Sequence, residues 1–191
     1  TFRNPGLTAK LATTLDHVSG GRAVLGIGGA WFEREHDAFG FDFGASVGER
    51  LDWLDEAVVL MRRLLDGERF SHEGPTYRFD DALNAPRPVQ AHLPIFIGGA
   101  GRRKTLRTVA QHADGWNLSG TLDEVRDALA ALEAHAADVG RDLATLEKTI
   151  SFPIVIDDDA EVAQRRMNAL MEANGIDTMG GGPHLVGSPA Q

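Results

Sequence analysis

The sequence predicts an α/β protein with a parallel sheet. Short, nearly all-apolar runs near residues 22–28, 94–98, 115–118 and 150–156 are each followed by a stretch with helical periodicity or helix-capping residues. Strands that are apolar on both faces are typical of parallel sheets covered by helices. Alternation of strand and helix is the pattern of right-handed crossover units. Because no low-complexity linker or short repeat divides the chain, we expect one domain over residues 1–191.

The predicted helices have recognisable ends. The first covers Pro5–Val18 and stops at Gly20. Ser46 and Glu49 predict a capping box ahead of a long amphipathic helix that ends near Gly67. The other expected elements are a small hairpin over Phe70–Phe79, a helix around Leu106–Ala113 with Arg102, Arg103 and Lys104 in its first turn, a helix from the Thr121 and Glu124 capping box to Gly140, and a helix over Ala160–Ala173.

The number of strands leaves the type of α/β fold open. A doubly wound sheet needs about five or six strands, and a (β/α)8 barrel has eight in about 250 residues. The strands expected here, with an insertion before the second, correspond to about half a barrel. The chain starts at Thr1 with a motif-dense stretch, and Gly187–Gln191 have the composition of a helix start. We therefore expect a fragment that is truncated at both ends.

Composition and charge disfavour several function classes. The net charge is −9, which argues against binding to nucleic acid or to an anionic membrane. The absence of cysteine excludes disulfides, thiolate zinc sites and a cysteine nucleophile. The histidines are scattered and no HExxH pattern occurs, so we expect no metal site. With no long apolar run and no signal-peptide pattern, we expect a cytoplasmic protein.

A glycine-rich segment is the clearest candidate for ligand binding. It joins a buried strand to a helix and consists of Gly98, Gly99, Ala100 and Gly101. The cations that follow, Arg102 first, oppose the helix dipole. A phosphate or similar anion would satisfy free N–H groups and offset this charge, and glycines let the backbone approach it. The alternative is a structural turn with solvated surface cations.

A second candidate follows the first strand, at Gly28, Gly29, Ala30 and Trp31. A dinucleotide fingerprint fits poorly, because Trp31 occupies the third-glycine position and no long helix follows at once. Small residues followed by an aromatic suit a face against which a flat ring could lie. The alternative is a packed strand end with Trp31 in the core. Glu33 and His36 come next and could transfer protons or contact substrate, although a solvated charged loop is the simpler interpretation of either.

Five separated segments carry a resemblance to a known family. They are residues 2–5 (FRNP), 14–22 (TLDHVSGGR), 25–36 (LGIGGAWFEREH), 94–99 (PIFIGG) and 113–117 (ADGWN). In this order, spread over most of the chain, they resemble the luciferase-like monooxygenase superfamily, and in particular its coenzyme F420-dependent oxidoreductase branch.

The resemblance implies a TIM barrel of roughly 300 residues, of which this chain would cover about strands four to seven with their helices. Gly28–Trp31 would lie at the cofactor pocket, and Gly98–Arg102 at the phosphate-bearing tail of the cofactor. The implied activity is hydride transfer between coenzyme F420 and a small organic substrate. An FMN-dependent monooxygenase and a non-catalytic truncated barrel that acts as an interaction unit are the alternatives. We also expect a homo-oligomer in full-length form.

Overall fold

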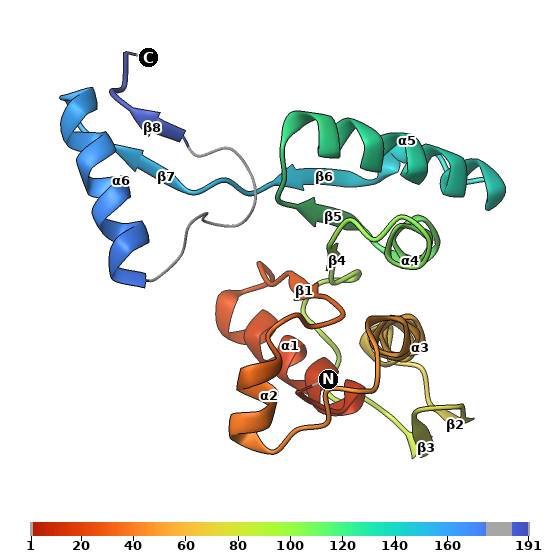
Figure 1. Cartoon of the computed structure of the whole chain (residues 1–191). Coiled ribbons are helices and arrows are strands. Elements are labelled where there is room, and N and C mark those ends of the chain that lie inside the picture. The colour runs from red at the N-terminus through yellow and green to blue at the C-terminus, as the bar shows by residue number, and fades with distance from the viewer. Residues whose placement is uncertain (1, 175–184, 191) are drawn as a thin grey trace.

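The computed structural model describes residues 2–174 and 185–190. Its elements are α1 (Pro5–Ser19), β1 (Leu25–Ile27), α2 (Glu33–Phe39), α3 (Val47–Leu65), β2 (Phe70–Glu73), β3 (Arg78–Ala82), β4 (Ile95–Gly98), α4 (Thr105–His112), β5 (Gly115–Leu118), α5 (Leu122–Asp138), a 3-10 turn (Leu143–Thr145), β6 (Glu147–Ile150), β7 (Ile154–Ile156), α6 (Ala160–Asn174) and β8 (Leu185–Gly187). Figure 1 shows their arrangement.

The main sheet is parallel, and its strand order β1-β4-β5-β6 follows the chain. β1, β4 and β5 fall inside the predicted apolar runs. Each new strand joins the same edge of the sheet, whereas a doubly wound sheet reverses its order at a switch point. The predicted α/β fold with a parallel sheet is therefore confirmed, and the described strands do not have a doubly wound order.

The two faces of this sheet have different surroundings. Side chains alternate between the faces of a strand, and Ile95, Ile97 and Trp116, which share one face, are at most 1% exposed. On this side α1, α3, α4 and α5 pack next to one another in chain order (Figure 1). Phe96 and Asn117 point to the other face and are only partly buried. The second face is therefore the one on which a ligand could approach the strands.

The predicted capping boxes are formed to different extents. At α5, Thr121 N donates to Glu124 Oε2 over 2.7 Å, and Glu124 N donates back to Thr121 Oγ1 over 3.3 Å. At α3, Ser46 Oγ accepts from Glu49 N at 3.1 Å, as expected. The Glu49 carboxylate, however, accepts from Ala45 N at 2.6 Å. The reciprocal half of this box is thus displaced by one residue, to the amide that precedes the cap.

The predicted hairpin is present as the antiparallel pair β2 and β3. Glu56 of α3 holds it in place: its Oε1 lies 2.7 Å from His72 Nε2, and its Oε2 accepts from Thr76 N at 3.0 Å. Burial raises the pKa of Glu56, but the hydrogen bonds from His72, Tyr77 and Thr76 together outweigh it and leave the pKa below its usual 4.5. The ionised carboxylate therefore fastens the hairpin to the helix.

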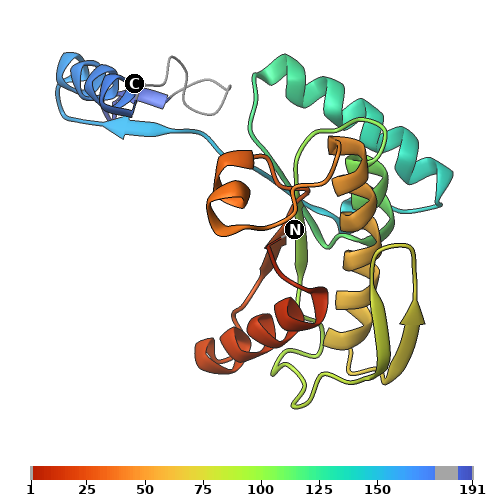
Figure 2. The ribbon, with the colours of Figure 1, turned by 60° about the horizontal axis from the view of Figure 1, so that its bottom comes forward.

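The prediction of a single strand over residues 150–156 is wrong, because two separate strands, β6 and β7, occupy this region. β6 ends at Ile150 and completes the main sheet, while β7 pairs in parallel with β8 in a separate small sheet. Figure 2 shows β7, β8 and α6 extending away from the main sheet. Pro153 lies in the break, and proline cannot donate a ladder hydrogen bond. The apolar residues continue across the break, so the hydrophobic pattern alone does not show where β6 ends and β7 begins.

The expected start of α4 is also wrong. Arg102, Arg103 and Lys104 form a turn before the helix, which begins at Thr105. Leu106 N donates to Gly101 O over 3.1 Å, so the first hydrogen bond of this segment spans a wider turn than an α-helical one. The three cations consequently precede the helix and do not occupy its first turn.

Candidate functional site

The two glycine-containing segments, far apart in the chain, meet at the carboxyl ends of β1 and β4. A Cβ atom built on Gly28 would lie 3.5 Å from the carbonyl oxygen of Gly98. Both segments also contact Leu51 of α3: a Cβ on Gly29 would lie 2.8 Å from Leu51 Cδ2, and one on Gly101 would lie 3.9 Å from Leu51 Cδ1. The fold therefore joins the two candidate sites of the sequence into one region.

Bare backbone forms part of this region. A Cβ on Gly26 would meet no atom within 4 Å, and those on Gly28 and Gly98 would meet only one backbone oxygen each, at 3.5 and 3.7 Å. We call these three residues the glycine shelf. A planar group can approach a backbone without side chains more closely than any other part of a strand. The shelf is thus open to a planar ligand.

The segment after β4, residues 99–104, presents free donors. Gly99 has a φ of 119°, and its N–H donates to Asn117 O over 3.0 Å. Within the described part of the chain, the backbone N–H groups of residues 100–104 donate no hydrogen bond to protein. Consecutive unpaired N–H groups next to a helix start favour an anion. The segment therefore has donors available for an anion.

The cations of this segment are already engaged with carboxylates. Arg102 Nη1 lies 3.7 Å from Asp127 Oδ2 of α5, and Lys104 Nζ lies 2.6 Å from Asp52 Oδ1 of α3. Both pairs are solvent-exposed, so each contributes little to stability. Protein carboxylates therefore neutralise part of the positive charge that we expected a bound anion to neutralise. The free N–H groups, more than the cations, support the phosphate hypothesis.

Trp31 is not a core residue. Its side chain is 86% exposed, and its ring centroid lies 5.3 Å from that of Phe32. The preceding Ala30 has a φ of 62°, in the left-handed region that a residue with a Cβ rarely adopts. The packed-core alternative is therefore wrong, and an indole is available at the strand end, as a ring-binding face requires.

Glu33 and His36 lie on the short helix α2, so the expectation of a charged loop is wrong. Glu33 is exposed in the first turn. His36 is only 1% exposed, with its ring centroid 4.1 Å from Phe2 and 4.7 Å from Phe43. His36 Nδ1 lies 3.0 Å from Phe32 O. This burial favours a packing role for His36, and the catalytic role of both residues stays a prediction.

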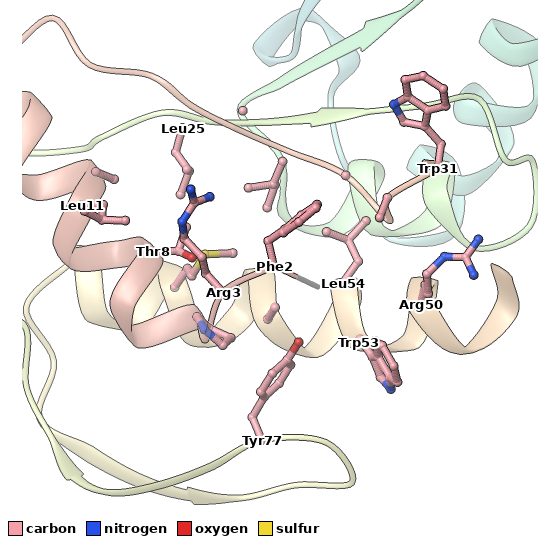
Figure 3. A pocket seen from close by; sticks show the side chains of 18 of the residues that line it. Phe2, Arg3, Thr8, Leu11, Leu25, Trp31, Arg50, Trp53, Leu54 and Tyr77 are labelled. Carbon is pink, nitrogen blue, oxygen red and sulfur yellow. The ribbon is translucent and has the colours of Figure 1, made fainter. Parts of the chain in front are cut away.

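A cavity of about 550 Å³ opens beside the shelf, between α1, β1 and α3 (Figure 3). Most of its lining is apolar, for example Leu11, Leu25 and Leu54. Predicted site residues that line it are Gly28, Ala30, Trp31 and His36. Glu33 and the Gly98–Arg102 segment are not part of its wall. The cavity therefore adjoins the first candidate segment and not the second.

Arg50 is a residue of this region that sequence reasoning missed. It is 6% exposed, lines the cavity, and donates from Nε to Gly29 O at 3.2 Å and from Nη1 to Phe43 O at 3.1 Å. Its guanidinium lies 3.7 Å from the centroid of the Phe43 ring. Within the described residues no carboxylate pairs with it. Arg50 lies four residues before Leu54, so helical spacing places it on the buried face of α3, and this spacing could have identified it from the sequence.

Two other classes of site have no support in the residues described. Among residues 2–174 and 185–190, no three His, Asp or Glu side chains come together as a metal-binding group. No helix in this part of the chain has the length and apolar character needed to span a membrane.

The match to a family model decides the family. Residues 1–184 match the model described as luciferase-like monooxygenase. The chain belongs to the luciferase-like monooxygenase family. Both F420-dependent and FMN-dependent enzymes are among the proteins to which this luciferase-like chain is similar.

Two relatives and one solved structure illustrate the similarity. The chain is 32% identical over 163 residues to an F420-dependent hydroxymycolic acid dehydrogenase of Mycobacterium tuberculosis, covering 84% of the chain and 44% of the relative. It is 30% identical over 147 residues to an FMNH2-dependent dimethylsulfone monooxygenase of Pseudomonas putida, covering 72% and 39%. An F420-dependent secondary alcohol dehydrogenase in complex with an F420-acetone adduct shares the fold, with a TM-score of 0.76 and 22% identity over 87% of this chain and 50% of that one. The luciferase-like chain thus spans half or less of these proteins.

Proposed function

We propose that the chain is part of an oxidoreductase that transfers a hydride between coenzyme F420 and a small organic substrate. One observation carries this proposal: the glycine shelf lies directly beside the unpaired N–H groups of residues 100–104. A cofactor that joins a flat ring to a phosphate needs these two surfaces next to each other. The similarity to F420-dependent enzymes supports the choice of cofactor.

For the architecture, we propose that β1, β4, β5 and β6 correspond to four consecutive strands, about four to seven, of a (β/α)8 barrel. The order of these strands along the sheet and the coverage of half of a related chain support this. On this proposal residues 1–191 are one luciferase-like domain that lacks the remaining strands. Active sites of such barrels lie at the carboxyl ends of the strands, which is where the glycine shelf ends.

The residues would divide the work as follows. Gly28, Gly29, Ala30 and Trp31 hold the ring, and Gly99, Ala100, Gly101 and Arg102 hold the phosphate. Gly98, at the edge of the glycine shelf, lies between the two. The buried guanidinium of Arg50 supports an anionic ligand, because it lines the neighbouring cavity without a carboxylate partner among the described residues. When bound, the cofactor supplies the hydride chemistry, and the protein orients it and excludes water.

Of the two α2 residues predicted as catalytic, we propose Glu33 for proton transfer and His36 for positioning. Glu33 is exposed and can exchange a proton with substrate, and His36 positions α2 through its contacts with Phe2 and Phe43.

We further propose a cytoplasmic homo-oligomer in which the full-length protein acts on a small molecule.

An FMN-dependent monooxygenase is the second candidate, and the similarity to the Pseudomonas putida enzyme favours it. Titrating F420 and FMN into the purified full-length protein, followed by absorbance and fluorescence, distinguishes the two. Tighter binding of F420 supports the first proposal, and tighter binding of FMN supports the second. Binding of neither cofactor would support the remaining alternative, a non-catalytic truncated barrel that acts as an interaction unit.

A further inference from the structure

Three polar side chains form a cluster on the face of the sheet opposite to the helices. Asn117 of β5 donates from Nδ2 to Thr149 Oγ1 of β6 over 2.9 Å and to Ser151 Oγ over 3.2 Å. Asn117 and Thr149 are partly buried, and Ser151 is exposed. None of the three belongs to the ring-binding or phosphate-binding residues described above.

The hydrogen bonds fix the orientation of the Asn117 amide. Thr149 Oγ1 donates to Trp116 O over 3.2 Å, so its single proton is used and it must accept from Asn117. The NH2 group of Asn117 therefore points to Thr149, and its Oδ1 points away. This oxygen has one protein contact, a long one of 3.4 Å from Ser151 Oγ. Asn117 Oδ1 thus keeps a second acceptor position for a ligand, and the exposed Ser151 hydroxyl can turn its proton from this long contact to the same ligand.

The cluster adjoins the phosphate-binding segment. Asn117 is the register partner of Gly98, and its carbonyl oxygen accepts from Gly99 N at 3.0 Å. Gly98 belongs to the glycine shelf, and a Cβ atom built on it would meet only Ile27 O, at 3.7 Å. A chain that connects a phosphate near residues 100–104 to a ring on the shelf passes over Gly98, and therefore next to Asn117.

We propose that Asn117 and Ser151 form a polyol subsite, which binds hydroxyl groups of the chain between phosphate and ring. A hydroxyl group both donates and accepts, and it matches the acceptor and donor that these side chains present. F420 and FMN both carry a ribityl chain at this place, so the subsite rests on the proposed function but not on the choice of cofactor. Thr149 is a positioning residue that acts by fixing the amide.

A binding series tests this subsite without measuring turnover. The ligands are the cofactor that the wild type binds, its dephosphorylated ribityl form and its ring with a methyl group in place of the chain; for FMN these are FMN, riboflavin and lumiflavin. We expect Asn117→Ala and Ser151→Ala to weaken the first two by about three- to tenfold, and lumiflavin by less than about twofold. Asn168→Ala, an exposed asparagine of α6, is the matched control and should change none of them.

The outcomes separate this inference from the proposed function. Equal weakening for all three ligands would place the contact on the ring and overturn the subsite, and so would unchanged affinities. The hydroxyl group bound here could instead belong to the substrate. Binding of sorbitol or another free polyol to the wild type but not to Asn117→Ala, with equal cofactor affinities in the two proteins, would indicate a substrate site and overturn the cofactor subsite. Failure of the wild type to bind any of the flavins or F420 overturns the proposed function itself. Ser151→Ala keeps the test valid if Asn117→Ala unfolds.

Discussion

The indole Nε1 of Trp116 donates a hydrogen bond of 2.8 Å to the carbonyl oxygen of Gly99. Trp116 is 1% exposed and belongs to the core on the helix side of β5, whereas Gly99 begins the exposed segment after β4. A core side chain thus reaches through the strand ends and fixes the first residue of the proposed phosphate-binding segment.

Trp116→Phe should therefore lower the free energy of unfolding by about 1–3 kcal/mol, since the Gly99 carbonyl loses its donor and the smaller ring leaves a gap. It should also weaken cofactor binding, because the segment is less fixed. Urea unfolding and cofactor titration measure the two effects. Trp31→Phe, at an 86% exposed position, is the control for stability and should change it by no more than about 0.5 kcal/mol. Equal stability of both variants would contradict this role of Trp116.

Gly99→Val should block close approach of a phosphate to the backbone. The substitution also strains the chain, because the φ of Gly99 is 119° and a Cβ would lie 3.4 Å from Thr105 Cγ2. Gly140→Val is the matched control: it introduces strain at a φ of 68°, with no atom within 4 Å. Both variants should lose about 1–2 kcal/mol of stability, but only Gly99→Val should lose cofactor affinity in a titration. Similar affinities in the two variants would remove the phosphate hypothesis.

Arg102→Glu should weaken cofactor binding by on the order of 1–3 kcal/mol, through charge reversal beside the phosphate. Turnover at saturating cofactor should change much less, because the phosphate is remote from the reacting ring. Titrations at two salt concentrations measure the effect, which should shrink at high salt. Arg126→Glu reverses an exposed charge on α5, where Arg126 pairs with Asp123 at 2.7 Å, and serves as control. Surface cations over a structural turn would leave both variants with wild-type affinity.

Ala30→Gly should stabilise the protein by about 0.5–1 kcal/mol. Ala30 has a φ of 62°, a conformation that costs an L-residue roughly 1–2 kcal/mol, and part of the gain is offset by the larger entropy of glycine in the unfolded chain. Thermal and urea unfolding test this. Ala45→Gly, just before the N-cap of α3, is the comparison, and no stabilisation is expected there. A loss of stability in Ala30→Gly would show that the Ala30 side chain makes contacts worth more than the strain.

Glu56→Gln should reduce the free energy of unfolding at neutral pH. On acidification the variant should lose less stability than the wild type does. Because the pKa of Glu56 is lowered from 4.5 in the folded protein, its contribution is fully present above pH 4.5 and disappears as the pH falls through the lower folded value. The stability difference between wild type and Glu56→Gln should therefore shrink on acidification below about pH 4.5. Urea unfolding from pH 3 to 7 measures it, with the exposed Glu172→Gln as control. A difference that grows in acid would contradict the assigned sign.

The local features of this protein could be read from its sequence. β1, β4 and β5 coincide with the apolar runs, and α5 begins at its predicted capping box. These signals depend on residues within a few positions of each other, so periodicity and capping chemistry suffice to find them. The family resemblance, carried by short contiguous motifs, could be recognised for the same reason, and the match over residues 1–184 confirms it.

Only the tertiary structure decided which distant residues meet. It placed the two glycine segments together over Leu51, buried His36 between Phe2 and Phe43, and paired Lys104 with Asp52. It also turned the end of the last apolar run into a strand of a second sheet. Pairing partners, burial and compensating charges depend on contacts between residues that lie tens of positions apart. A local pattern shows that a side chain is apolar or charged, but its surroundings are set when strands and helices pack.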